Sequence, residues 1–103
     1  MAGFKTEPSV SRRIADINPN LDTRVRLIGK IIDVQISYFV IDDGSSKTTV
    51  SYSDDIPKPA ELKTGMLVRV IGFVIPSDPP ELQAEIIQDM EKLNLKYLEI
   101  LRQ

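Results

Sequence analysis

The most constraining feature of the sequence is a long run in which apolar and polar residues alternate strictly. One side of this run is apolar or small, and its members are Val25, Leu27, Gly29 and Ile31. Strict alternation predicts a β-strand with one buried face. The apolar positions resume at Val34 and not at Asp33, so the parity shifts by one residue, and Gly29 stands where a sharp bend is easiest. A long, bent strand of this kind is suited to closing a small barrel.

Four further segments have the pattern of strands, and they cover Tyr38–Asp42, Lys47–Tyr52, Leu67–Ile75 and Leu82–Ile87. The turn chemistry of residues 43–46 joins the first two of these as a hairpin. Gly72 interrupts the fourth strand of the chain much as Gly29 interrupts the first. Two prolines break residues 53–64, which leave room for at most a turn of helix around residues 60–62 and are expected to cross one end of the barrel. These patterns predict an all-β barrel over residues 14–89.

The two ends of the chain differ from the barrel. Residues 1–13 are polar and aperiodic, and we expect a flexible arm there. Residues 90–103 change to a helical period, with an apolar stripe made of Met90, Leu93, Tyr97, Ile100 and Leu101 and widened by Leu95 and Leu98. This stripe is wider than a helix lying only on its own barrel needs. The pattern therefore predicts a C-terminal α-helix that also contacts a partner.

Three segments, taken in order, resemble the OB folds of replication protein A. They are Ile14 to Ile31, Phe39 to Gly44 and Leu62 to Gly72. The family patterns that they resemble are V-x-x-x-G-x-V, which here ends in Ile31, F-x-I/L-x-D-G and L-x-x-G-x-x-V-x-V-x-G. The resemblance covers residues 14 to about 103 and implies a five-stranded OB-fold barrel. A terminal helix after the fifth strand is similar to that of the small and middle subunits, whose helices pack as a bundle in a heterotrimer. A telomere-capping complex that mimics this trimer is equally similar.

Composition excludes several classes of function. The chain has no Cys and no His, so disulfides, the usual zinc sites and the commonest general base are absent. The turn at Asp42 to Ser46, even together with Asp54 and Asp55, lacks the spacing of a calcium loop. No phosphate-cradling glycine loop or nucleophile is recognisable. We expect a non-catalytic protein without metal, cofactor or small-molecule substrate, and without a membrane segment.

Single-stranded nucleic acids are bound by aromatic rings that stack on bases and by basic side chains that contact phosphates. The candidates for these roles are Arg24, Arg26, Lys30, Tyr38, Lys47 and Tyr52. Tyr38 faces outward by alternation, whereas Tyr52 fits the core as well as it fits a stacking platform. Arg69 is assigned to the solvated surface. Because the net charge is −2, any attraction for phosphates must be local, and we expect the isolated chain to bind single-stranded DNA weakly.

The outer face of the barrel also predicts a protein interface. Ile28 on the first strand, and Ile71 and Phe73 on the fourth, should face outward from neighbouring strands. The candidate partner residues are these three together with Met90, Leu93, Tyr97, Leu98, Ile100 and Leu101. The alternative is that the chain's own terminal helix covers the three outward residues.

The resemblance implies a subunit that helps to assemble a heterotrimer with larger OB-fold subunits and that contacts single-stranded DNA in replication, repair and recombination. Such a protein is expected inside the cell, in the nucleus of a eukaryote or the cytoplasm of an archaeon. Two alternatives stay open. One is an OB domain that binds structured RNA. The other is a scaffold subunit, in a telomere-capping or another complex, that makes no contact with nucleic acid.

Overall fold

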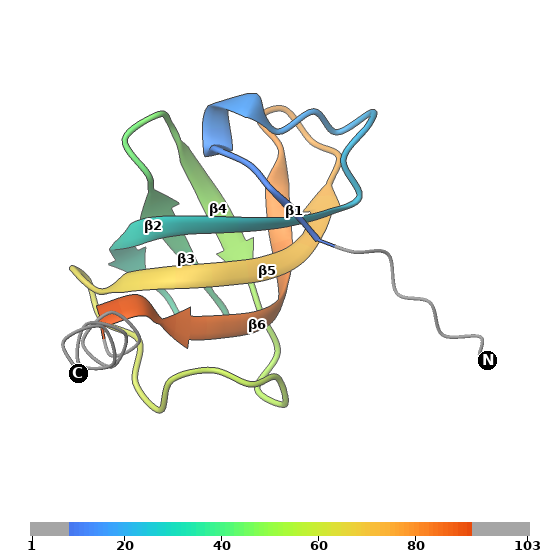
Figure 1. The fold of residues 1–103 in the computed structure, drawn as a ribbon. Coiled ribbons are helices and arrows are strands. Elements are labelled where there is room, and N and C mark those ends of the chain that lie inside the picture. Colours follow the sequence, from blue (N-terminus) through green and yellow to red (C-terminus); the bar gives the residue numbers. More distant parts are fainter. Residues whose placement is uncertain (1–8, 92–103) are drawn as a thin grey trace, which may run out of the picture.

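Residues 9–91 are described by a computed structural model of the chain, and six strands in them form one sheet that curls into a barrel (Figure 1). The strands are β1 (Val10–Ser11), β2 (Arg24–Val34), β3 (Tyr38–Asp42), β4 (Lys47–Ser51), β5 (Leu67–Ile75) and β6 (Glu81–Asp89). Their order is β1-β2-β3-β4-β6-β5, and a further pairing of β2 with β5 closes the barrel. β4 and β6 are parallel neighbours, and so are β1 and β2. The closed five-stranded barrel predicted from the sequence is confirmed.

Closure depends on the length and the bend of β2. Its first part pairs with β5 from Arg24 to Lys30, and its last part pairs with β3 from Lys30 to Val34. The register shifts between Ile31 and Asp33, as the change of parity in the sequence predicts. A Cβ atom at Gly29 would lie 3.1 Å from the carbonyl oxygen of Asp42, so the glycine allows β3 to pass close to the bend.

The barrel interior is filled by aliphatic side chains around one phenylalanine. The largest fully buried side chains are Phe39, Ile31, Ile41, Leu82, Val25, Val50, Val68 and Val70. At one end of the barrel, a short 3-10 helix, η1 (Ile14–Asp16), adds Ile14 and the following Ile17 to the core. The loop between β4 and β5 passes below β6 in Figure 1, and its residues Ile56 and Leu62 pack against the core. This loop contributes to the barrel end, as expected.

Several boundaries differ from the prediction. The predicted arm over residues 1–13 is wrong for its last part, because Val10 and Ser11 pair with Val25 and Arg26. Two residues are too few to show a period, so this strand leaves no pattern in the sequence. β6 runs from Glu81 to Asp89 and is longer than predicted. Residues 60–62, where the sequence left room for at most one helical turn, are not helical. The predicted terminal helix lies outside the described residues from position 92 onward. Within residues 9–91, no helix has both the length and the apolarity that a membrane crossing needs.

Gly72 provides a sharp test of the barrel geometry. A Cβ atom at this position would meet the carbonyl oxygen of Gln83 at 2.4 Å and the Cα atom of Ala84 at 3.0 Å, and both are backbone atoms of the paired strand. We expect Gly72→Ala to lower the free energy of unfolding by about 1–3 kcal/mol or more, because β5 and β6 must separate to admit the methyl group. Urea denaturation of the whole chain measures this change.

Gly29→Ala is the matched comparison, because its Cβ atom would meet the backbone at 3.1 Å and not at 2.4 Å. It should lower the midpoint of unfolding less than Gly72→Ala does. An equal effect of the two substitutions would contradict the strand spacing described here.

Candidate nucleic-acid and partner surfaces

The predicted stacking residue Tyr38 lies on the outer face of β3 and β4, here called the β3–β4 surface. Its residues are Tyr38, Val40, Asp42, Lys47, Thr49 and Ser51. They pair across the two strands, Tyr38 with Ser51, Val40 with Thr49 and Asp42 with Lys47. Tyr38 is 40% exposed and its cross-strand neighbour Ser51 is small, so its ring is partly accessible to a base.

The charges of this surface nearly cancel. Lys30 on β2 and Lys47 on β4 both pair in register with Asp42 on β3, so in the sheet Asp42 stands between two lysines. The Asp42 carboxylate also accepts a hydrogen bond of 2.7 Å from the backbone N–H of Gly44, which fixes it in the turn. The surface therefore offers one aromatic ring and a net charge near +1 from these three side chains. That combination suits a weak contact with a single strand.

Tyr52, the other aromatic candidate, packs against the core of the barrel. Its ring centroid lies 5.8 Å from that of the buried Phe39, with the rings tilted at 43°. Its hydroxyl group donates to the carbonyl oxygen of Ile36 at 3.4 Å. The alternation of β4 points Thr48, Val50 and then Tyr52 inward, which explains this placement. Of the two roles left open by the sequence, the structure places Tyr52 in the core role.

The two arginines predicted to accompany Tyr38 lie on another part of the barrel. Arg24 and Arg26 are on the half of β2 that pairs with β5, opposite Phe73 and Ile71. The Arg24 guanidinium pairs with the Glu85 carboxylate of β6 at 2.6 Å. Arg26 donates to the carbonyl oxygen and the hydroxyl group of Ser9. The structure thus brings Lys30 and Lys47 near one another on the Tyr38 side, but it does not bring Arg24 and Arg26 there.

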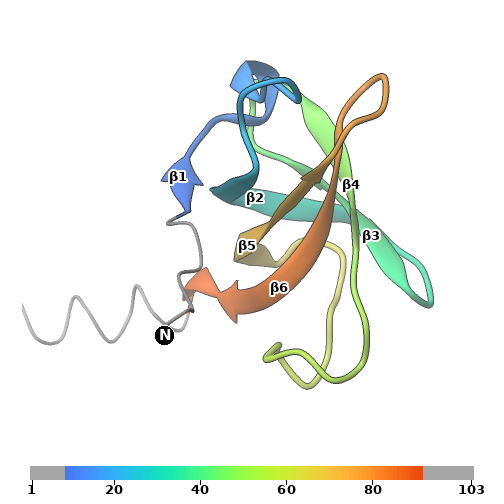
Figure 2. The same cartoon turned by 90° about the vertical axis from the view of Figure 1, so that its right-hand side faces the viewer.

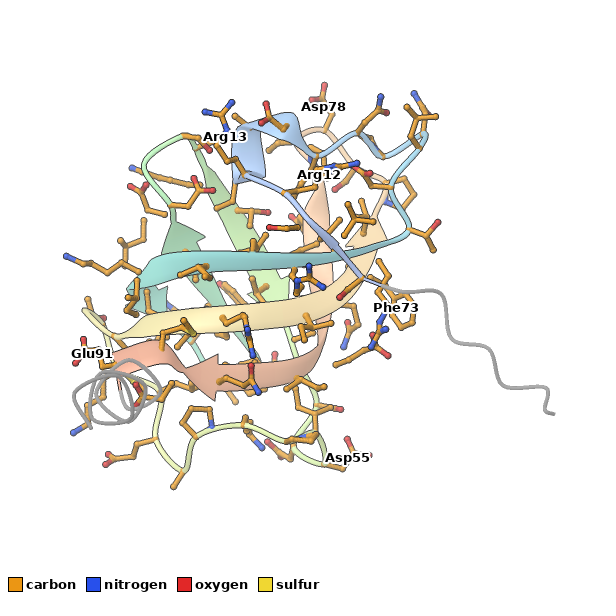
Figure 3. The ribbon with its side chains drawn as sticks, viewed as in Figure 1. Arg12, Arg13, Asp55, Phe73, Asp78 and Glu91 are labelled. Atoms are coloured by element: carbon orange, nitrogen blue, oxygen red, sulfur yellow. The ribbon has the colours of Figure 1, made fainter. Side chains whose placement is uncertain are left out.

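The outward apolar residues lie on the β2 and β5 faces as the sequence predicts. Ile28 is 46% exposed and Phe73 is 41% exposed, and Ile71 is half-buried. Each of them lies opposite an arginine on the neighbouring strand. The pairs are Ile28 with Arg69, Ile71 with Arg26 and Phe73 with Arg24. Apolar and cationic side chains therefore alternate on this face, and they do not form a continuous apolar patch. Figure 3 shows Phe73 at the end of β5.

The remaining predicted interface residues belong to the end of the chain. Met90 is half-buried in the described part. Leu93, Tyr97, Leu98, Ile100 and Leu101 lie outside the described residues.

Three arginines that the sequence did not single out as site residues gather at the barrel end covered by η1. Arg12, Arg13 and Arg69 line a groove of about 590 Å³ together with Arg26 and Ile28. Figure 3 shows Arg12 and Arg13 beside η1. The adjacent pair of arginines was the available signal, but the aperiodic segment around it gave no indication of what it would face.

Two aspartates fasten this end of the barrel. Asp22 accepts a backbone hydrogen bond of 2.9 Å from Asn18, and its carboxylate, 6% exposed, pairs with Arg12 at 3.2 Å. Asp43 accepts 2.7 Å and 2.9 Å hydrogen bonds from the backbone N–H groups of Ile14 and Ser45. Asp22 thus joins Arg12 to the segment after η1. Asp43, in the β3–β4 turn, holds the first residue of η1. Among residues 9–91, no group of His, Cys, Asp and Glu side chains could hold a metal ion.

The comparisons with known proteins agree on one fold. The sequence matches no protein-family model and no curated protein. The structure is similar to a chain of a replication protein A heterotrimer bound to single-stranded DNA, with a TM-score of 0.58 and 13% identity, over 71% of this chain and 62% of that one. It is also similar to the telomere capping protein Ten1 from S. pombe, with a TM-score of 0.61 and 18% identity, over 91% of this chain and 93% of that one. A chain of the S. pombe Stn1–Ten1 complex gives a TM-score of 0.62 and 16% identity, over 94% and 90% of the two chains.

The chain has an OB fold. The parallel pairing of β4 with β6 and the closure of β2 on β5 are its topology, and the end-on view of the barrel in Figure 2 shows the strands around one interior. In this OB fold the β3–β4 surface keeps Tyr38 40% exposed. On the other side of the barrel, β1 pairs with the first part of β2.

Asp22 and Asp43 are expected to make the stability of the OB barrel depend on pH. The backbone hydrogen bond from Asn18 lowers the pKa of Asp22, burial opposes this effect, and Arg12 adds to it. Burial raises the pKa of Asp43, but hydrogen bonds from Ser45, Ile14 and Ser46 outweigh it and leave that pKa lowered.

Both carboxylates therefore stabilise the folded state above their unfolded pKa of about 3.9, and this contribution is lost as the pH falls through the lower folded pKa. We expect the free energy of unfolding to fall steeply below about pH 4, and to fall less steeply in Asp22→Asn and in Asp43→Asn. Urea denaturation at a series of pH values measures the slope. Asp54→Asn, an exposed residue of the β4–β5 loop, is the control and should keep the slope of the parent. Parallel curves for all four proteins would refute the assignment.

Proposed function

We propose that this chain is a non-catalytic OB-fold subunit of a complex that binds single-stranded DNA, of the replication protein A type. The observation that supports this most directly is the β3–β4 surface, with the 40% exposed side chain of Tyr38 and a lysine on each side of Asp42. Sheet surfaces of this kind let bases stack on a ring while lysines contact the backbone. The likeness to a chain of a replication protein A heterotrimer bound to single-stranded DNA supports the same function.

The contribution of this subunit to DNA affinity is modest in the proposal. One ring and two lysines beside an aspartate provide few contacts, and the net charge of −2 gives the molecule no general attraction for phosphates. Arg24 and Arg26 are not included, because they lie on the part of β2 that pairs with β5 and not beside Tyr38. Most of the affinity of the complex would come from its larger subunits.

Assembly is the main role that we propose. Residues 90–103 would form a helix whose apolar side chains pack with helices of larger OB-fold subunits, in replication, repair and recombination. This follows from the wide apolar stripe in the sequence, since an isolated helix of this length is marginal in water and needs a partner. The protein would act in the nucleus of a eukaryote or in the cytoplasm of an archaeon.

A telomere-capping subunit is the second candidate, and one observation favours it. The match with Ten1 extends over 93% of that protein, whereas the match with the replication protein A chain extends over 62% of that chain. Purification of the tagged chain from its own cells, followed by identification of the co-purifying chains, separates the two candidates. A large subunit with several OB folds supports the first, and a single partner that acts only at telomeres supports the second. Co-purification with structured RNA alone would contradict both.

We expect the isolated chain to bind an unstructured oligothymidylate weakly, with an affinity that falls as salt rises because phosphate contacts release counterions. Tyr38→Ala should weaken binding by about 5- to 100-fold, the effect of losing one stacked base. Fluorescence polarisation at low salt measures the affinity.

Tyr38→Phe is the matched control, because it keeps the ring and should bind as the parent does. Tight, salt-insensitive binding by the lone chain would contradict this part of the proposal. So would equal affinities of the parent and Tyr38→Ala.

Assembly is tested by replacing Leu93, Tyr97 and Leu101 with Ala in one variant. We expect the barrel to stay folded and the variant to elute apart from its partner subunits, because each truncation removes apolar contacts that contribute on the order of 2–5 kcal/mol when fully buried. Size-exclusion chromatography of the mixed subunits measures co-elution, and circular dichroism verifies the barrel.

The control variant replaces Lys92, Lys96 and Glu99 with Ala, which changes the polar positions of the same segment and should leave assembly intact. If the folded variant with Leu93, Tyr97 and Leu101 replaced still co-elutes with the partner subunits, residues 90–103 do not form the assembly interface.

A further inference from the structure

The groove at the η1 end of the barrel is a second surface that the proposed function does not use. Its walls come from segments far apart in the chain: the residues after β1, η1, the middle of β2, the β3–β4 turn and β5. The residues that matter for its chemistry are Arg13, Asp16, Arg26, Ile28, Asp43 and Arg69. The groove has a volume of about 590 Å³, which is enough for several side chains of another molecule.

Two of the guanidinium groups in the groove form no ion pair with a carboxylate of the described residues. Arg26 bonds to the carbonyl oxygen and the hydroxyl group of Ser9, both neutral, through Nη1. Arg69 donates from Nε to the neutral side-chain oxygen of Gln88 at 2.7 Å. By contrast, Arg13 is paired with Asp16 at 2.8 Å. A guanidinium has five N–H donors, so Arg26 and Arg69 each retain donors for a carboxylate or phosphate.

An aliphatic side chain lies between these two charges. The register of β2 with β5 places Arg26 opposite Ile71 and Ile28 opposite Arg69. Arg26 and Arg69 are therefore diagonal neighbours on the outer face, and Ile28, 46% exposed, lies beside both. A ligand that satisfies this site carries an anionic group next to an apolar one.

The backbone of β2 is also available beside the groove. The carbonyl oxygen of Arg26 accepts a hydrogen bond from the N–H of Arg12, so it points away from β5 and towards β1. The carbonyl oxygen of Ile28, two residues later, points to the same side, because backbone directions repeat every second residue in a strand. β1 pairs only as far as Arg26, and β3 begins to pair at Lys30. Between them, Leu27 to Gly29 pair with neither strand on this edge.

The lining distinguishes a peptide from a nucleic acid. Among residues 9–91 no aromatic side chain lines the groove, so these residues offer bases nothing to stack on. The carboxylates of Asp16 and Asp43 also line it, and they would repel a chain of closely spaced phosphates. Arginine, in turn, is enriched at protein interfaces relative to the rest of the surface.

We propose that this groove binds an extended segment of a partner protein in which an acidic side chain and an aliphatic side chain are two residues apart. The carboxylate bonds to the guanidinium groups of Arg26 and Arg69, and the aliphatic side chain covers Ile28. The proposal does not depend on the DNA-binding role, because it uses another face of the barrel.

The test uses the full chain and a fluorescein-labelled decapeptide, in which the pattern glutamate, serine, leucine, serine, glutamate occurs twice. Residues two apart share a face of an extended peptide, so its acidic and apolar groups meet the groove together. Fluorescence polarisation measures binding to the parent, to Arg26→Gln with Arg69→Gln, and to Lys58→Gln with Lys63→Gln. The lysine variant changes the net charge equally but lies in the β4–β5 loop. A second peptide with serine in place of leucine and a labelled oligothymidylate are the comparison ligands.

We expect the arginine double variant to bind the decapeptide at least about tenfold more weakly, and the lysine variant to bind within about twofold of the parent. The leucine-free peptide should bind the parent more weakly than the decapeptide does. If circular dichroism shows the double variant to be unfolded, Arg69→Gln alone, which keeps the Arg26 contact with Ser9, replaces it and should show the same direction.

Three results would overturn the proposal. The first is an equal loss in the lysine variant, which would indicate only a general effect of charge. The second is loss of oligothymidylate binding and not of peptide binding in the arginine variant, which would indicate a phosphate site. The third is no binding of the decapeptide by the parent up to about 1 mM.

Discussion

The double pairing of β2 is the interaction on which the rest of the structure depends. One strand of eleven residues pairs with β5 along its first part and with β3 along its last part. Without the bend at Gly29 and the register shift after Ile31, the sheet would stay open and its two edges would be exposed. Every surface discussed above takes its place from this strand. The β3–β4 surface begins where β2 turns towards β3, and the arginine groove lies beside the part that pairs with β5.

Closure also separates the charges of the molecule in space. Side chains that are close together in the sequence of β2 diverge around the barrel, so Lys30 is beside Asp42 while Arg26 is beside Ile71. The same sequence run thus contributes to two surfaces with different chemistry. One combines lysines with an exposed tyrosine, and the other combines arginines with an exposed isoleucine. A subunit that contacts both DNA and proteins needs such a separation, because the contacts then do not compete.

The sequence was sufficient for the barrel and for the direction of most side chains. Alternation over nine or more residues determines which face is buried, and the shift of parity at Asp33 indicated the bulge of β2 correctly. The bounds of β2, β3 and β5 follow from the same pattern. Strand β1 could not be predicted, since two residues have no period. The groove could not be predicted either, because Arg12, Arg13 and Arg69 meet only through tertiary packing. Tyr52 is an intermediate case. The alternation of the strand predicted an inward side chain, but only the contact with Phe39 decided between core and surface.

The short strand β1 has a consequence for how the barrel opens. It is joined to β2 by few backbone hydrogen bonds and fastened by the ion pair of Arg12 with Asp22, whereas β5 runs along β2 for seven register pairs from Arg24 to Lys30. Structures built in this way unfold in steps of unequal free energy, and the weakly joined segment fluctuates first. Fraying of β1 would uncover the backbone of Val25 and Arg26 while the rest of the barrel stays closed. Such fraying would expose a longer edge of β2 for strand addition than the closed structure presents.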